Sequence, residues 1–152
     1  MQSLFSEFIE ELSEAIDFPL HLDPLNTCTL SIDNDFTIHI EEGEENHLVF
    51  IGSFISEISP GKYRDKVFRE CLKENSHLDA TSIFAFNSLN SSLCLFTTLD
   101  TNRLDMEACT IKISEFIEKV SLWKKAIETN DIASIHSNFK EKTYDNPFGI
   151  KL

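Results

Sequence analysis

The stretch NTCTLSIDNDFTIHIEEGEENHLVFIGSFI, residues 26–55, decides the fold of this chain. Apolar and polar side chains alternate from Leu30 to Ile32 and from Phe36 to Ile40, which is the two-residue period of half-buried strands. Residues 33–35, Asp-Asn-Asp, tolerate left-handed backbone and favour a tight antiparallel turn between these strands. Because residues 42–46 supply a second turn, the stretch predicts a meander of three antiparallel strands.

The third strand of this meander, residues 47–55, differs because both of its alternating sets are apolar. A strand with one wet face does not need a second apolar set, so we expect both sides to be covered. Exposure would forfeit roughly 1.5–3 kcal/mol for each large side chain. The cover is either a bound peptide or the protein's own first or last helix. The two sets are Leu48, Phe50 and Phe54 on one side and Val49, Ile51 and Ile55 on the other.

The segments around the meander predict three helices and a hairpin. Ser3 is the predicted N-cap of an amphipathic helix of about 14 residues, which ends before Pro19. A second helix opens at Ser59-Pro60-Gly61, with the proline at its first position. A hairpin over residues 82–99 and a last helix over residues 103–127 follow.

This order of elements, α-β-β-β-α-β-β-α, predicts an α+β domain in which helices pack on an antiparallel sheet. We expect residues 1–128 to form a single domain. Beyond it the pattern weakens, so we expect residues 129–152 to be a mobile C-terminal tail.

Charge is distributed unevenly along the chain. The 26 Asp and Glu outnumber the 13 Lys and Arg, giving a formal net charge of −13, and no Lys or Arg precedes Lys62. The excess of acid therefore lies on the N-terminal segment and the meander. Nucleic-acid binding is disfavoured because it requires a basic face, whereas a basic protein partner is favoured. The alternative is that these carboxylates only keep a small domain soluble.

The sequence lacks the patterns of catalytic, cofactor and membrane-spanning proteins. It has no glycine-rich phosphate loop and no apolar run of membrane-spanning length, and its acidic N-terminal residues do not favour a secretory signal, so we expect a cytosolic protein without a cofactor. The histidines lack metal-ligand spacing, although His39 and His47 could approach each other near Cys28. The four cysteines are widely spaced and are expected to be reduced core thiols; they are Cys28, Cys71, Cys94 and Cys109.

Four local patterns, together with the order of elements, resemble one family. They are FIEEL in the first helix, TCTLSID followed by FTIHI in the meander, SIFAFN after the second helix, and EFIEKVSLWKKAI in the last helix. Over residues 1–128 the chain resembles the class I type III secretion chaperones of the Tir chaperone family. The resemblance implies a non-enzymatic, usually dimeric, cytoplasmic bacterial protein. Such a protein wraps the N-terminal segment of a secreted effector in extended form, keeps it soluble and presents it to the export apparatus.

Two sets of site residues follow from this hypothesis. We expect apolar grooves to hold client side chains and carboxylates to attract client Lys and Arg, the residues being Leu4, Phe8, Leu12, Val49, Ile51, Glu10, Glu11, Glu41 and Glu42. The resemblance implies a dimer through the second helix and the following strand, with Tyr63, Val67, Cys71, Ile83, Phe84 and Phe86 at the interface. The partner is a second copy or a related chaperone, and for the two phenylalanines the alternative is an intramolecular core.

Two other classes of function stay open on the sequence. An acidic regulatory decoy would occupy the nucleic-acid surface of a transcription component, and it would need carboxylates spread over a broad face. A small-molecule or metal-dependent enzyme of the α+β type would need a polar pocket with converging ionisable groups.

Overall fold

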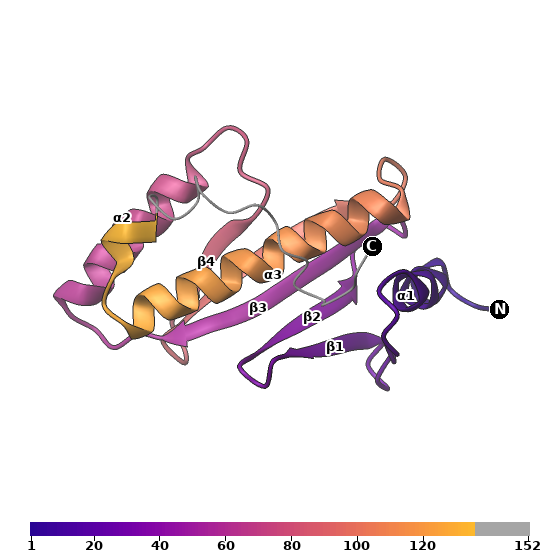
Figure 1. The fold of residues 1–152 in the computed structure, drawn as a ribbon, viewed down its shortest axis with the longest axis horizontal. Coiled ribbons are helices and arrows are strands. Elements are labelled where there is room, and N and C mark those ends of the chain that lie inside the picture. The colour runs from indigo at the N-terminus through magenta and orange to yellow at the C-terminus, as the bar shows by residue number, and fades with distance from the viewer. Residues whose placement is uncertain (136–152) are drawn as a thin grey trace.

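The computed structural model describes residues 1–135 and confirms the predicted α+β order (Figure 1). Five strands form one antiparallel sheet in the order β1-β2-β3-β5-β4. The rest of the predicted tail, residues 136–152, lies outside the described residues. The elements are α1 (Leu4–Ala15), β1 (Thr27–Ile32), β2 (Phe36–Glu42), β3 (Leu48–Glu57), α2 (Lys62–Asn75), β4 (Ile83–Asn87), β5 (Ser92–Asp100), α3 (Met106–Glu128) and the 3-10 turn η1 (Ile132–Ser134).

Local sequence signals set several of these boundaries. The Ser3 hydroxyl accepts a hydrogen bond from the Ser6 N–H at 3.1 Å and caps α1, as predicted. The β1–β2 turn holds Asp33 and Asn34 at φ values of 49° and 55°, the left-handed backbone that their short polar side chains tolerate. The predicted start of the second helix is wrong by two residues. Gly61, with φ at 145°, turns the chain in a way that side chains disfavour, so α2 begins only at Lys62.

The core lies between the sheet and the helices α1 and α3, with α3 running across the sheet along β3 (Figure 1). Val49 and Ile51 of β3 are 2% and 0% exposed, so the protein's own helices cover this apolar set. At the far end of α3, Trp123 is fully buried, with its ring centroid 4.3 Å from that of Phe84 in β4. The sheet and these two helices therefore share one hydrophobic core.

The folded unit extends past the predicted domain boundary at residue 128. Ile132 and Ile135 are 0% and 1% exposed, and η1 packs against α3. The sequence after residue 128 has neither the two-residue period of a strand nor the repeated apolar stripe of a long helix, so it did not predict a packed element. Two isoleucines three residues apart nevertheless cover the end of the core.

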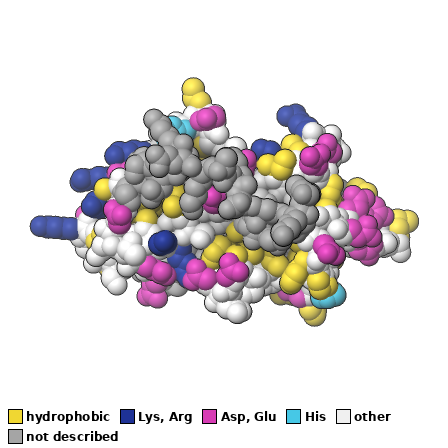
Figure 2. Space-filling model, viewed as in Figure 1, with side chains coloured by type: hydrophobic (Ala, Val, Ile, Leu, Met, Phe, Trp, Pro, Cys, Tyr) yellow, Lys and Arg dark blue, Asp and Glu magenta, His cyan; other side chains and the backbone are white. Residues whose placement is uncertain are grey.

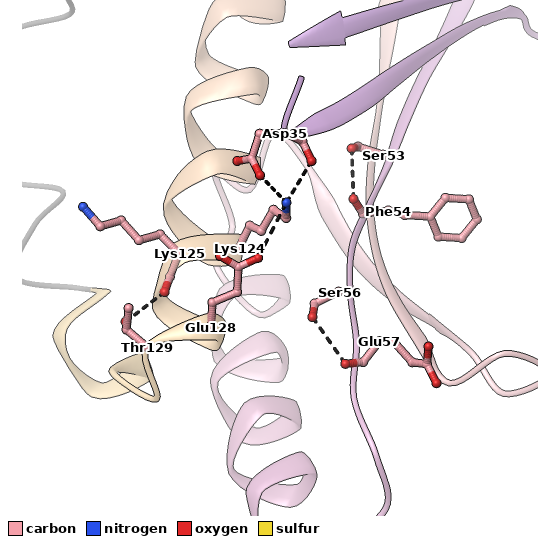
Figure 3. A network of polar contacts seen from close by, with 9 residues as sticks. All are labelled: Asp35, Ser53, Phe54, Ser56, Glu57, Lys124, Lys125, Glu128 and Thr129. Atoms are coloured by element: carbon pink, nitrogen blue, oxygen red, sulfur yellow. Dashed lines mark hydrogen bonds and ion pairs between the residues drawn. The ribbon is translucent and has the colours of Figure 1, made fainter. Parts of the chain in front are cut away.

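A clasp of polar contacts joins the β1–β2 turn to the end of α3 (Figure 3). The Lys124 ammonium donates to the Asp35 carbonyl at 2.8 Å, forms an ion pair with the Asp35 carboxylate, and lies 3.6 Å from Glu128. The hydrogen bond to the Asp35 carboxylate raises the pKa of Lys124. The clasp therefore fixes the meander against a helix that is far away in the sequence.

Replacing Lys124 by methionine should lower the free energy of unfolding by about 0.5–1 kcal/mol, since the pair is partly solvated. The raised pKa of Lys124 means that this contribution is complete at neutral pH and is lost only as the pH rises through that value. Urea unfolding at pH 7 measures the change. Lys125→Met is the matched control because the Lys125 side chain points away from the clasp (Figure 3), and an equal loss in both variants would contradict the assignment.

Candidate functional site

The sheet has one covered face and one open face. Successive side chains of a strand point to opposite sides, and those directed toward α1 and α3 are buried. On the opposite side, Phe50 and Phe54 of β3 are 37% and 52% exposed. Of the two kinds of cover expected for this strand, the protein's own helices cover the Val49 set, and no described element covers Phe50 and Phe54. The reason is that the helices all occupy the side on which the Val49 set lies.

Strand pairing gathers apolar side chains on this uncovered side. Phe96 of β5 pairs with Gly52 of β3 and with Ile83 of β4, and the Phe96 ring stacks on Phe50 with centroids 5.4 Å apart. We call the resulting surface the open face. Its apolar members are Phe50, Phe54, Ile83, Ala85, Cys94 and Phe96.

The open face contains a hollow of about 430 Å³ between β2, β3 and β5. Aromatic rings form its walls, and the side chains of His39 and Glu41 stand at the β2 side. A hollow with apolar walls and a single carboxylate suits an apolar side chain beside a cation. Its aromatic lining comprises Phe50, Phe54 and Phe96.

The two edge strands differ in how much of their outer edge is free. On β4, the Asn75 side chain holds both main-chain groups of Phe84, donating to its carbonyl at 3.0 Å and accepting from its N–H at 2.8 Å. On β1, the Asp23 N–H donates to the outward-facing carbonyl of Thr27 at 2.9 Å. The main-chain groups of Ser31 face the same way and have no partner among residues 1–135. The second half of β1 is therefore open to a further strand, whereas β4 is blocked at its middle.

Charge is distributed unevenly over the face of the molecule in Figure 2. Carboxylates gather at the end where α1 lies, and Lys and Arg project from the opposite end, over α2. The exposed ridges that carry these charges are Glu7, Glu10, Glu11 and Glu14 on α1 and Lys62, Lys66, Arg69 and Lys73 on α2.

The residues predicted to hold a client fall into two groups. Phe8, Leu12, Val49 and Ile51 lie in the core, so their side chains do not line a surface groove. They are used internally because the apolar stripe of α1 and the covered side of β3 are complementary to α3. The remaining residues are exposed as expected, and they are Leu4, Glu10, Glu11, Glu41 and Glu42.

The residues predicted at a dimer interface mostly join α2 to the rest of the chain. Val67, Cys71 and Phe84 are buried, and the Tyr63 hydroxyl donates to the Ile127 carbonyl at 2.9 Å. Phe86 meets Phe68 edge-on with centroids 4.8 Å apart and lies under the Arg64 guanidinium. Phe84 thus lies in the chain's own core and Phe86 is half-buried, while Ile83 is 37% exposed on the open face.

The cysteines and histidines are not brought together. Cys28 lies on the covered face and His39 on the open face, and within residues 1–135 no group of His, Cys, Asp and Glu could hold a metal ion. All four cysteines are free thiols, and burial raises the pKa of each, that of Cys71 to about 12. Cys94 is half-buried at the hollow and is the most accessible of them.

No helix in the part of the chain that the structure describes is long and apolar enough to cross a membrane.

Sequence reasoning missed the open face as a site. Phe96 was not singled out, Cys94 was expected to be a core thiol, and Phe50 and Phe54 were expected under cover. The signal was present, because a central strand with two apolar sets must leave one of them without helices when all the helices lie on the same side. Only the strand order, with β5 inserted between β3 and β4, places these side chains next to one another.

A sheet that leaves an apolar face and an acidic end exposed is typical of a protein-binding domain. The chain belongs to the Tir chaperone protein (CesT) family, whose model matches residues 7–124. This is the family that the sequence resemblance predicted, and it does not favour the acidic decoy.

Several solved structures share this fold. A chain of the HopA1–SchA chaperone–effector complex has 14% identity and a TM-score of 0.66, over 81% of this chain and 94% of that one. The Yersinia pestis type III secretion chaperone SycH, in complex with a stable fragment of YscM2, has 14% identity and a TM-score of 0.59, over 77% and 97%. The ExoT–SpcS complex from Pseudomonas aeruginosa has 14% identity and a TM-score of 0.60, over 80% and 97%. No curated protein sequence matches the chain.

Proposed function

We propose that this chain binds the N-terminal segment of a secreted effector in extended form, keeps it soluble and competent for secretion, and delivers it to the export apparatus. The open face carries this proposal, because a soluble protein rarely leaves adjacent aromatic side chains exposed unless a partner covers them. Chaperones of the same fold form complexes with effectors, HopA1–SchA among them. We further propose that the protein acts in the bacterial cytoplasm, uses no cofactor and catalyses no reaction.

Two kinds of contact would hold the client. A client strand can add to the outer edge of β1 at Ser31, where main-chain hydrogen bonds give affinity with little demand on sequence. Apolar client side chains can cover the rings of Phe50 and Phe54 on the open face. Carboxylates such as Glu41 beside this face would attract client Lys and Arg and speed the encounter.

Two surfaces could join two copies of the chain, the outer face of α2 and the exposed side of β4. A two-fold axis through the outer face of α2 would bring its four exposed Lys and Arg side chains together against one exposed carboxylate, Asp65, so that like charges predominate and repel. We therefore propose that a homodimer uses Ile83 and Ala85 of β4, and that a contact through α2 requires a related chaperone with an acidic second helix.

The test starts with affinity capture from the native host. The purified N-terminal segment of a captured secreted protein is then titrated against the chaperone, with the remainder of that protein as control. Alkylation by N-ethylmaleimide reports the site, because Cys94 lines the hollow while Cys28, Cys71 and Cys109 are buried. Tight binding of the N-terminal segment with protection of Cys94 is the expected result. Binding that leaves Cys94 reactive would place the client elsewhere.

Reversing Glu41 and Glu42 to lysine should slow client association by about 10-fold at low salt and flatten its salt dependence, because the change removes electrostatic steering. Reversal of Glu10 and Glu11 should act in the same direction. Stopped-flow association measured across salt concentrations checks the effect.

The matched control for the charge reversals changes two exposed carboxylates from the charge-balanced part of the chain, Asp79 and Glu107. An equal slowing in this control would mean that net charge matters and its location does not.

A further inference from the structure

Gly52 occupies the middle of β3, which is the central strand of the sheet. Glycine weakens a strand because it contributes no side chain to packing and costs more entropy on folding. The backbone does not require it there, since Gly61 is the glycine held at positive φ among the described residues. An added Cβ would lie 3.7 Å from Cε1 of Phe50 and 3.9 Å from the Leu95 carbonyl oxygen, which are ordinary contact distances. The fold therefore does not explain the missing side chain.

Because Gly52 has no side chain, its backbone forms the floor of the hollow on the open face. Gly52 pairs with His39 on β2 and with Phe96 on β5, so it lies between the polar side of the hollow and its aromatic wall. It shares the open side of β3 with Phe50 and Phe54, two residues before and after it. A side chain at this position would project into the space that these rings enclose.

We propose that Gly52 forms the floor of a specificity pocket, which takes one large aliphatic or aromatic side chain of the client while Glu41 binds a client Lys or Arg beside it. This inference rests on the proposed function and goes beyond it by naming the client side chain that enters the pocket, which we call the anchor, and the basic client residue next to it. The pocket walls are apolar rings, and the carboxylate that lines it comes from a part of the chain with no Lys or Arg. Charge and apolar area thus both favour a client with an apolar residue next to a basic one.

The decisive variant is Gly52→Val. Valine places a branched side chain on the floor of the hollow and favours the strand, so the midpoint of urea unfolding should stay the same or rise. Affinity for the N-terminal segment of the captured client should fall about 10-fold or more, because the anchor loses its place. Thr98→Val is the matched control, since Thr98 lies on the same side of β5, opposite Phe50, but does not line the hollow. This control should bind as tightly as the wild-type protein.

Alanine substitution along the client segment completes the test. One apolar client residue should carry most of the loss, and once it is alanine, Gly52→Val should no longer weaken binding. If the wild-type protein binds no secreted segment, the proposed function itself fails. If the wild-type protein binds but Gly52→Val binds equally well, the pocket fails and the proposed function stands.

Other occupants of the hollow would also overturn the proposal. If Gly52→Val lowers the solution mass of the free protein without changing client affinity, a second copy occupies the hollow. If removal of residues 136–152 raises client affinity and abolishes the effect of Gly52→Val, the chain's own C-terminal segment occupies the hollow.

Discussion

Replacing Phe50 and Phe54 together by serine is expected to lower the affinity for a client segment about 100-fold. Both rings are already partly covered in the free protein, at 37% and 52% exposure, so a client gains only the remaining burial. Each ring then contributes about half of the roughly 1.5–3 kcal/mol that full burial provides, so the two together give about 1.5–3 kcal/mol, a range whose upper end corresponds to a 100-fold change. Titration calorimetry with the purified N-terminal segment measures this loss.

The fold should survive this double replacement. The rings lie outside the core, and the main loss is the stack of Phe50 on Phe96, worth about 0.5–1.5 kcal/mol. Leu25 and Leu89 are both highly exposed and do not line the hollow, so they provide the matched control when they are changed together to serine. A 100-fold loss in the control, or none in the Phe50 and Phe54 variant, would remove the open face as the client site.

Trp123→Ala should lower the free energy of unfolding by about 3–5 kcal/mol, the usual cost of removing a buried tryptophan side chain. Trp123 is 0% exposed, and it lies where α3 meets β4, with its ring centroid 4.3 Å from that of Phe84. Its loss opens a cavity between the last helix and an edge strand, and α2 rests on the same strand. Guanidinium unfolding followed by circular dichroism measures the change.

Trp123→Phe serves as the control for this replacement. The indole Nε1 is buried without a hydrogen-bond partner among the described residues, so phenylalanine removes an unsatisfied donor while it keeps most of the ring. It should therefore cost much less than alanine. Equal losses in the two variants would mean that the indole nitrogen has a partner and that hydrogen bonding, not packing, dominates.

The sequence by itself determined the elements of this protein and their order. Local physics is sufficient for this, because a two-residue period, a turn of Asp33 and Asn34 with left-handed backbone, and a cap at Ser3 all act within a few residues. The concentration of carboxylates before Lys62 and the resemblance to secretion chaperones were also readable without coordinates. These features predicted the α+β class and the chaperone family.

Only the tertiary structure decided which side of the sheet is left open. Alternation groups Phe50 with Phe54 and Val49 with Ile51, but both sets are apolar, so the pattern cannot tell which set meets the helices. Helix placement and the insertion of β5 between β3 and β4 are long-range events that depend on packing across the whole core. For the same reason the role of Gly52 became visible only when Phe96 was placed beside it.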